Sequence, residues 1–237
     1  MTGAPETTLS VTRSEGTGRP VLFLHGLASH AARDWPAQEW APVLGGRPAV
    51  RIDLPAHGRS AGVGVLPTRG VVALIADAVA GEEVDVVAYS LGARLAWALA
   101  GNPGTTVRRL VLGGLSPIEP FTLVDLPSAR SALAGGEAPA DPITGMILGM
   151  ATSPGNRPDA LLDLVEGLAS EPFDPAVGAP AQPVLLIGGT EDPMAQGIDT
   201  LAAAVPHARV VRVPGDHGAA LHAPEFRAAV AEFLAED

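Results

Sequence analysis

The sequence predicts an α/β fold with a mostly parallel sheet that is flanked by helices on both faces. Short apolar runs rich in Val, Ile and Leu alternate with longer segments in which apolar residues recur at helical spacing. The apolar runs are nearly continuous, which is typical of parallel strands that are covered on both faces. Gly and Pro separate the segments, and the strand–helix alternation indicates right-handed crossovers around one sheet.

Six segments have the pattern of buried strands: 19–26, 49–55, 84–90, 107–114, 182–189 and 208–215. A seventh, 7–12, alternates apolar and polar residues, and we expect an edge strand there that suits an antiparallel orientation. The helices expected between the strands lie at about 34–44, 67–80, 91–101, 197–205 and 223–235. The last of these has Pro224 near its first turn, where proline is favoured, and carries an apolar stripe.

The alternation is interrupted between the fourth and fifth of these strands. This stretch contains eleven prolines from Pro117 to Pro183, with helical patterns only at 143–151 and 159–169. Structureless loops of this length are rare inside compact domains. The sequence therefore predicts a cap or lid at 116–180, inserted into a core that is formed by 1–115 and 181–237.

Composition excludes several classes of function. The 237 residues have a formal net charge of −11, which disfavours nucleic-acid and anionic membrane-surface partners. All fifteen basic residues are Arg, so the Lys of a phosphate-binding loop or a pyridoxal Schiff base is missing. The chain has no Cys and no spacing typical of metal ligands, so we expect no cofactor and no metal. Without a signal-like start or a long apolar run, a cytoplasmic protein with a small-molecule substrate is expected, its oligomeric state left open.

The strongest chemical signal is the segment Ala88-Tyr89-Ser90-Leu91-Gly92, where a buried strand passes directly into a helix. This pattern is typical of a nucleophile elbow, G-x-S-x-G, with Ala in place of the first Gly. The turn is so tight that the residues two before and two after the serine must be small. It would raise the Ser90 hydroxyl above the sheet, at a helix N-terminus that favours developing negative charge.

A serine nucleophile needs a base, and the base needs a third group to orient it. Asp192 follows the strand at 182–189, and His217 follows the strand at 208–215. Both therefore lie beyond the carboxyl ends of strands, where ligands bind in open α/β sheets. The order Ser90, Asp192, His217 predicts a catalytic triad, with Glu191 and His222 as rival candidates for the acid and the base.

The segment His25-Gly26-Leu27 ends an early strand and indicates an oxyanion hole. The backbone N–H of Leu27 can face the elbow and, together with the N–H of Leu91, hold a developing oxyanion. We expect His25 to shape this loop rather than to carry protons. Asp53 comes too early in the chain for the acid of the triad.

With these motifs in place, the chain resembles a small α/β-hydrolase over nearly its whole length, through His25-Gly26, "DLPAHGRS" at 53–60, the elbow, Asp192 and His217. The resemblance implies the α/β-hydrolase fold, Ser90 as nucleophile, His217 as general base and Asp192 as its orienter. It also implies Leu27 and Leu91 as oxyanion donors. The chain departs from the family pattern at Ala88 and in the residues that follow His217.

Three functions are compatible with these residues. The first is a serine hydrolase acting on a small, fairly apolar ester, thioester or lactone through an acyl-enzyme. The second is a lyase, because "YSLGAR" resembles the elbow of the MenH-like synthases of menaquinone biosynthesis. In those enzymes, arginines bind a polyanionic substrate. Arg94 matches one of these arginines, but the 116–180 segment adds only Arg130 and Arg157. The third is a non-catalytic binding module on the same scaffold.

Overall fold

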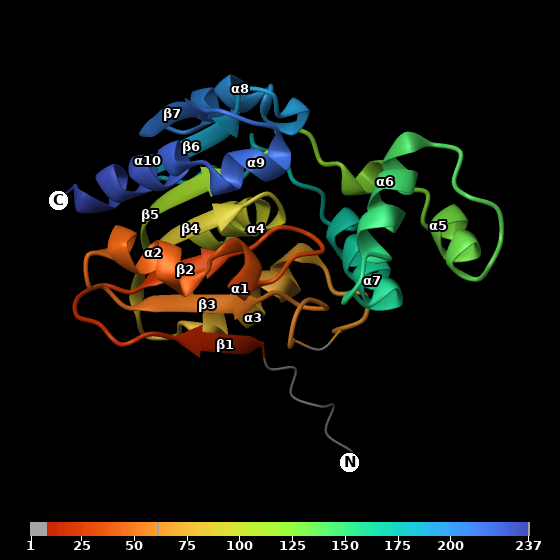
Figure 1. Ribbon diagram of the computed structural model, residues 1–237, viewed down its shortest axis with the longest axis horizontal. Coiled ribbons are helices and arrows are strands. Elements are labelled where there is room, and N and C mark those ends of the chain that lie inside the picture. Colours follow the sequence, from red (N-terminus) through yellow and green to blue (C-terminus); the bar gives the residue numbers. More distant parts are fainter. Residues whose placement is uncertain (1–8, 61, 237) are drawn as a thin grey trace, which may run out of the picture.

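The computed structural model describes residues 9–60 and 62–236, and its centre is a single seven-stranded sheet (Figure 1). The strands are β1 (Ser10–Arg13), β2 (Val21–Leu24), β3 (Ala49–Asp53), β4 (Glu83–Tyr89), β5 (Thr106–Gly113), β6 (Val184–Gly189) and β7 (Ala208–Val213). Their order in the sheet is β1-β3-β2-β4-β5-β6-β7. β1 pairs antiparallel with β3 at one edge, and the other strand pairs are parallel.

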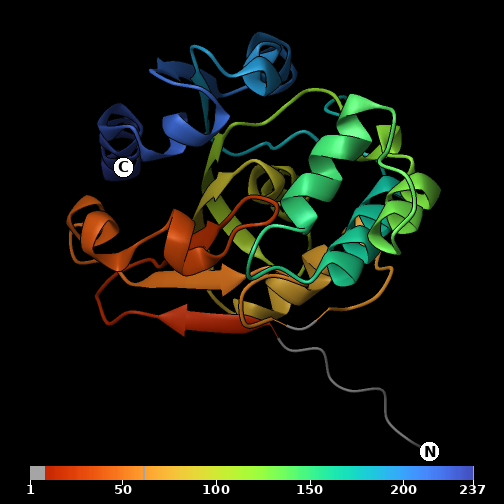
Figure 2. The same cartoon turned by 45° about the vertical axis from the view of Figure 1, so that its right-hand side comes forward.

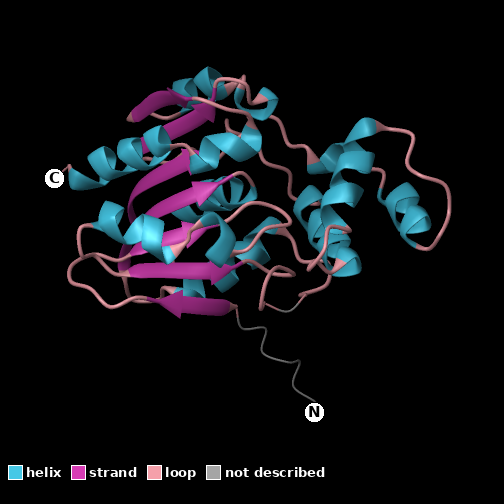
Figure 3. Cartoon of the chain, viewed as in Figure 1, coloured by secondary structure: helices cyan, strands magenta, loops and turns pink. Residues whose placement is uncertain are grey.

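Helices cover both faces of the sheet, as predicted (Figure 3). One face carries α3 (Thr68–Ala78), α4 (Leu91–Ala100) and α8 (Ile198–Ala204). The other face carries α1 (Ala31–Asp34), α2 (Ala37–Leu44), α9 (His217–His222) and α10 (Pro224–Ala235). Strands β2 to β6 are buried almost throughout, because apolar side chains on both of their faces pack against helices.

The 116–180 segment connects β5 to β6 and lies beyond the carboxyl ends of the parallel strands (Figure 2). It contains the short 3₁₀ helix η1 (Phe121–Leu123) and the helices α5 (Leu126–Leu133), α6 (Pro142–Ala151) and α7 (Pro158–Ala169). Asp125 and Asp141 cap α5 and α6 by accepting hydrogen bonds from backbone N–H groups one turn on, and each helix has a proline in its first turn.

The structure differs from the sequence prediction in three places. The helix expected at 34–44 begins only at Ala37, because the chain turns at Trp35 and Pro36 between the separate short helix α1 and α2. α5 and α9 were not expected, since both are short and have too few apolar residues for a recognisable period. The strand expected at 7–12 begins at Ser10, and residues 7–8 lie outside the described residues. Within 9–60 and 62–236, no helix has the length and apolar character needed to cross a bilayer.

Candidate active site

Ser90 lies on the tight turn between β4 and α4. Its backbone has φ 52° and ψ −116°, a conformation that costs a residue with a side chain about 1–3 kcal/mol. The Ser90 N–H donates to the Gly113 carbonyl at 2.8 Å, which fixes the turn to the neighbouring strand. A Cβ at Gly92 would collide with the carbonyl oxygens of Leu24 and His25, so the small residue expected at this position is required. Backbone strain held in place in this way is typical of a functional residue.

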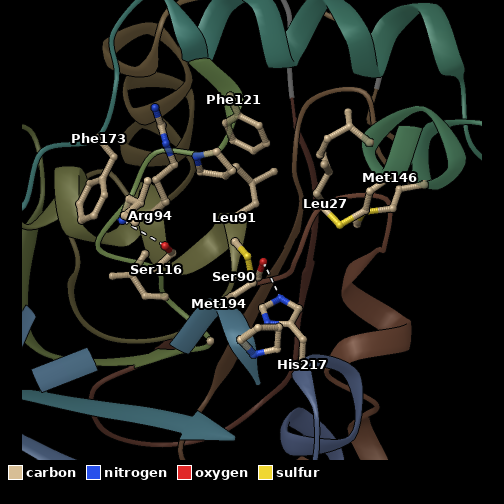
Figure 4. A pocket seen from close by; sticks show the side chains of 17 residues that line it. Leu27, Ser90, Leu91, Arg94, Ser116, Phe121, Met146, Phe173, Met194 and His217 are labelled. Carbon is tan, nitrogen blue, oxygen red and sulfur yellow. Dashed lines mark hydrogen bonds between the residues drawn. The ribbon is translucent and has the colours of Figure 1, made fainter. Parts of the chain in front are cut away.

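Ser90, His217 and Asp192, from three different strand ends, form one chain of hydrogen bonds, here called the hydrogen-bonded triad. The Ser90 Oγ lies 3.0 Å from His217 Nε2 (Figure 4), and His217 Nδ1 lies 2.8 Å from Asp192 Oδ2. Because a carboxylate only accepts hydrogen bonds, Nδ1 carries the imidazole proton, and Nε2 is left to accept from the serine hydroxyl. Asp192 is buried, and its other oxygen accepts the Met194 N–H at 2.9 Å.

Tyr89 holds the backbone of His217, a role that the sequence analysis missed. The Tyr89 hydroxyl donates to the His217 carbonyl oxygen at 2.6 Å, and the two rings pack with centroids 5.3 Å apart. Burial raises the pKa of Tyr89, so the hydroxyl remains a donor. Gly114 makes room for both rings, since a Cβ there would come within 2.8 Å of Tyr89 and 3.0 Å of His217. The only sequence signal was an aromatic residue directly before the serine.

The Leu27 N–H lies between two backbone N–H groups that are already hydrogen-bonded. The neighbouring N–H groups are taken: that of Gly26 donates to Asp34 Oδ2 at 3.0 Å, and that of Ala28 donates to His57 Nε2 at 2.9 Å. The Leu27 N–H between them has no hydrogen-bond partner within the described part of the chain. Leu27 lines the cavity that also contains Ser90, and an oxyanion hole requires backbone N–H groups that are not bound elsewhere.

Leu91 supplies a second donor of the same kind. It is the first residue of α4, so its N–H has no acceptor inside the helix. Leu91, Leu27 and Ser90 line the same cavity. The two residues named from the sequence as oxyanion donors therefore line the same cavity as the serine.

Two buried histidines fix the loop that carries Leu27. His25 Nε2 accepts the Leu54 N–H at 2.9 Å and its Nδ1 donates to the Gly26 carbonyl, while His57 Nε2 accepts the Ala28 N–H and its Nδ1 donates to the Pro55 carbonyl. These bonds require both rings to be neutral. Burial lowers the pKa of His25 to about 4 and that of His57 to about 3. As expected, His25 shapes the loop, and His57 shares this role, which the sequence analysis did not assign to it.

A cavity of about 240 Å³ lies over Ser90, between the carboxyl edge of the sheet and the 116–180 segment. Its walls are predominantly apolar, and its lining includes three methionines, Met146, Met150 and Met194. The other lining residues are Leu27, Ser90, Leu91, Arg94, Gly114, Leu115, Ser116, Ile118, Pro120, Phe121, Ile147, Phe173, Pro193 and His217. A cavity that is larger than the roughly 150 Å³ that holds benzene, yet below the usual drug-sized range, fits a small apolar molecule.

The rival candidates from the sequence lie elsewhere. Glu191 and His222 are exposed, and His222 is at the far end of α9. The Asp53 carboxylate is buried at the end of β3, where it accepts the N–H groups of Ala31 and Arg59. Among the residues that the structure describes, no three potential ligand side chains are grouped as a metal site would require.

The comparisons with known proteins agree with this architecture. The Alpha/beta hydrolase family matches residues 21–233. The enol-lactonase from Burkholderia xenovorans superposes with a TM-score of 0.76 at 21% identity, covering 96% of each chain. A thermophilic esterase from Thermogutta terrifontis gives 0.72 at 21% identity, covering 95% of this chain and 92% of the other.

MenH from S. aureus gives a TM-score of 0.72 at 18% identity, covering 94% of this chain and 97% of the other. At such identities the likeness shows the fold alone. Among curated proteins, none is significantly similar to this chain in sequence. The family match covers most of the chain, and the structures confirm the predicted α/β-hydrolase fold. The chain is therefore an enzyme of the alpha/beta hydrolase family.

Proposed function

We propose that this enzyme is a serine hydrolase that cleaves a small, fairly apolar ester, thioester or lactone through an acyl-enzyme on Ser90. The observation that carries the proposal is the continuous hydrogen-bonded triad, 3.0 Å from Ser90 Oγ to His217 Nε2 and 2.8 Å from His217 Nδ1 to Asp192 Oδ2. This geometry leaves the imidazole nitrogen nearest the hydroxyl ready to take its proton.

In the proposed reaction, His217 Nε2 takes the Ser90 proton while Oγ attacks the substrate carbonyl carbon. The carbonyl oxygen becomes an oxyanion that accepts hydrogen bonds from the Leu27 and Leu91 N–H groups. The imidazolium, stabilised by the Asp192 carboxylate, then gives its proton to the leaving alcohol or thiol. Water, activated by the same imidazole, hydrolyses the acyl-enzyme and restores the serine. One oxyanion donor is typically worth about 3–4 kcal/mol of barrier.

The cavity supports the choice of substrate. Its apolar walls and its methionines favour an apolar acyl or alkyl group, and methionine adapts readily to different shapes. We propose that the 116–180 segment acts as a cap that supplies most of this wall. The thioester and lactone alternatives share the reacting carbonyl, and the triad does not distinguish them.

Elimination chemistry of the MenH type has less support. It requires free arginines for a polyanionic substrate, and the three candidates from the sequence have protein partners. Arg94 pairs with Glu119, Arg130 pairs with Asp163 and Glu166, and Arg157 donates to the Ser60 carbonyl. A proteolytic or esterolytic triad needs no such cations.

The test is hydrolysis of p-nitrophenyl esters of graded acyl length by the wild type, by Ser90→Ala and by Ser153→Ala as the matched control. Ser153 is exposed, and its hydroxyl donates to the Gly149 carbonyl within α6. The expected result is loss of turnover in Ser90→Ala alone, with an unchanged circular dichroism spectrum. Equal turnover by Ser90→Ala and wild type would overturn the proposal.

A further inference from the structure

One side chain of the cavity lining, Arg94, carries a permanent charge, and an ion pair with the protein already neutralises it. Arg94 lines the cavity in the second turn of α4, and Glu119 of the 116–180 segment lies against it, with Arg94 Nη2 2.5 Å and Nε 2.6 Å from Glu119 Oε2. Each side chain of the pair is only 5% exposed. In Figure 4, Arg94, Phe121 and Phe173 gather on one side of Ser90, away from His217.

We propose that Glu119 neutralises Arg94 and thereby makes the cavity selective for substrates whose buried substituent is uncharged. This inference rests on the proposed hydrolase function and names its substrate class more narrowly. It assigns Glu119, a residue that does not itself line the cavity, as a specificity-determining residue.

The remaining donors of Arg94 are also occupied. Nη1 donates to Thr68 Oγ1, and Nη2 donates to the carbonyl oxygens of Leu168 and Glu171, each at 3.0 Å. Each of the three guanidinium nitrogens therefore donates to the protein. A substrate carboxylate entering this end of the cavity would lose its water and meet a cation that is already paired, with the Glu119 carboxylate close behind it.

Glu119 also fixes the aromatic wall of the cavity. Its Oε1 accepts the Phe121 N–H at 3.1 Å and its Oε2 accepts the Phe173 N–H at 2.8 Å. Phe173 packs edge-on against Trp97 of α4, with ring centroids 5.5 Å apart. One carboxylate thus sets both the charge and the shape of this end, because the residues that it holds include two of the cavity's aromatic side chains.

The experiment compares matched ester pairs that differ by a terminal carboxylate, placed on the acyl chain in one series and on the alcohol in the other. The wild type is expected to favour the neutral ester by about tenfold or more in kcat/KM in at least one series, the size of one lost charge-assisted hydrogen bond. Equal kcat/KM for neutral and charged esters in both series would overturn the inference.

In that same series, Glu119→Gln leaves Arg94 cationic and unpaired, so the preference should shift by about tenfold toward the carboxylate ester. The double variant Arg94→Gln with Glu119→Gln removes both charges and should lose this gain. The matched control is Glu166→Gln, which breaks the Arg130–Glu166 pair on α7 outside the cavity and should leave the preference unchanged. An unchanged preference in Glu119→Gln, or a gain that survives in the double variant, would contradict the inference.

Two further measurements keep the inference testable. If Glu119→Gln does not fold, Arg94→Met leaves the Glu119 carboxylate unpaired and should instead favour esters with a terminal ammonium. The absence of this shift would contradict the inference.

If the wild type hydrolyses no ester, the proposed function fails, yet calorimetry still tests selectivity with hexanamide and adipic acid monoamide. The neutral amide should bind more tightly, and equal binding would contradict the selectivity by itself.

Discussion

The carboxyl edge of the sheet and the 116–180 segment meet at one cavity but are built differently. At the edge, buried polar groups make directional hydrogen bonds: Asp192 holds His217, and His25 and His57 hold the loop of Leu27. The 116–180 segment contains the buried carboxylate of Glu119, but it lines the cavity mainly with apolar side chains, several of them flexible. Its Met146 is 48% exposed and its Ile118 is 66% exposed, although both line the cavity.

From this contrast we expect the carboxyl edge to determine reactivity and the 116–180 segment to determine substrate selectivity. Rigid, hydrogen-bonded groups suit a reaction whose atoms must be placed within a fraction of an ångström. Flexible apolar groups suit the selection of substrates by size. Changes at the carboxyl edge should therefore alter rates for every substrate, and changes in the 116–180 segment should alter the preference between substrates.

The largest effect is expected for Asp192→Asn. The amide no longer fixes the imidazole tautomer, so kcat should fall on the order of 10⁴-fold for short and long acyl esters alike. Glu191→Gln is the neighbouring control, because Glu191 is exposed and should leave kcat unchanged. Steady-state kinetics with both esters checks this, and a loss confined to one acyl length would break the separation drawn above.

The next effect is on stability against acid, and it arises only at the carboxyl edge, because 116–180 contains no histidine. Burial lowers the folded pKa of His25 to about 4 and that of His57 to about 3, below the unfolded value of 6.5. As the pH falls below 6.5, the unfolded chain takes up protons that the folded chain does not. Each histidine should therefore remove about 2 kcal/mol of unfolding free energy between pH 7 and pH 5.

Urea unfolding of wild type and His57→Gln at pH 7 and pH 5 measures this loss. The Gln amide oxygen can accept the Ala28 N–H and does not titrate, so the variant should lose about 2 kcal/mol less than the wild type. Equal losses would show that the neutral state of His57 does not contribute to stability.

A smaller effect is expected for Tyr89→Phe. The variant keeps the ring but removes the hydrogen bond to the His217 carbonyl, typically worth about 1 kcal/mol. We expect kcat to fall by about fivefold at constant KM, with the same factor for each acyl length. An altered preference between acyl lengths would place Tyr89 in substrate selection instead.

The smallest effect is expected for Met146→Ala in the 116–180 segment. Met146 is half-exposed, so its truncation should change the free energy of unfolding by less than about 0.5 kcal/mol. It should lower kcat/KM for the longest acyl ester by about fourfold, the contribution of about one buried methylene, and leave the acetate ester unchanged. Equal losses for acetate and the long ester would contradict selection by this segment.

The two regions also differed in how far the sequence could describe them. At the carboxyl edge, buried strands are followed at once by Ser90, Asp192 and His217, and parallel strands necessarily bring their ends to one side. The α/β fold was therefore predictable from periodicity alone. The hydrogen bonds among the three residues depend on the register in which the strands pair. That register could not be predicted from the apolar pattern of the sequence.

The 116–180 segment was less predictable. α5 has a weak apolar period, and its start at Asp125 is marked by a capping residue rather than by hydrophobic spacing. In the Arg94–Glu119 pair, one residue precedes β5 in the chain and the other follows it. Only the packing of the 116–180 segment onto α4 brings the two side chains together. The bond from Tyr89 to the His217 backbone is equally non-local, so it left no pattern in the sequence.

The central claim is that the Ser90 oxygen is the nucleophile, and site mapping after reaction with a fluorophosphonate tests it most directly. The protein is treated with the probe and digested, and the modified peptide is identified by mass spectrometry. We predict a single adduct on Ser90 that forms in parallel with loss of esterase activity and is slowed in Asp192→Asn. Complete loss of activity with the adduct on another residue, or esterase activity that persists once Ser90 is fully modified, would contradict the account.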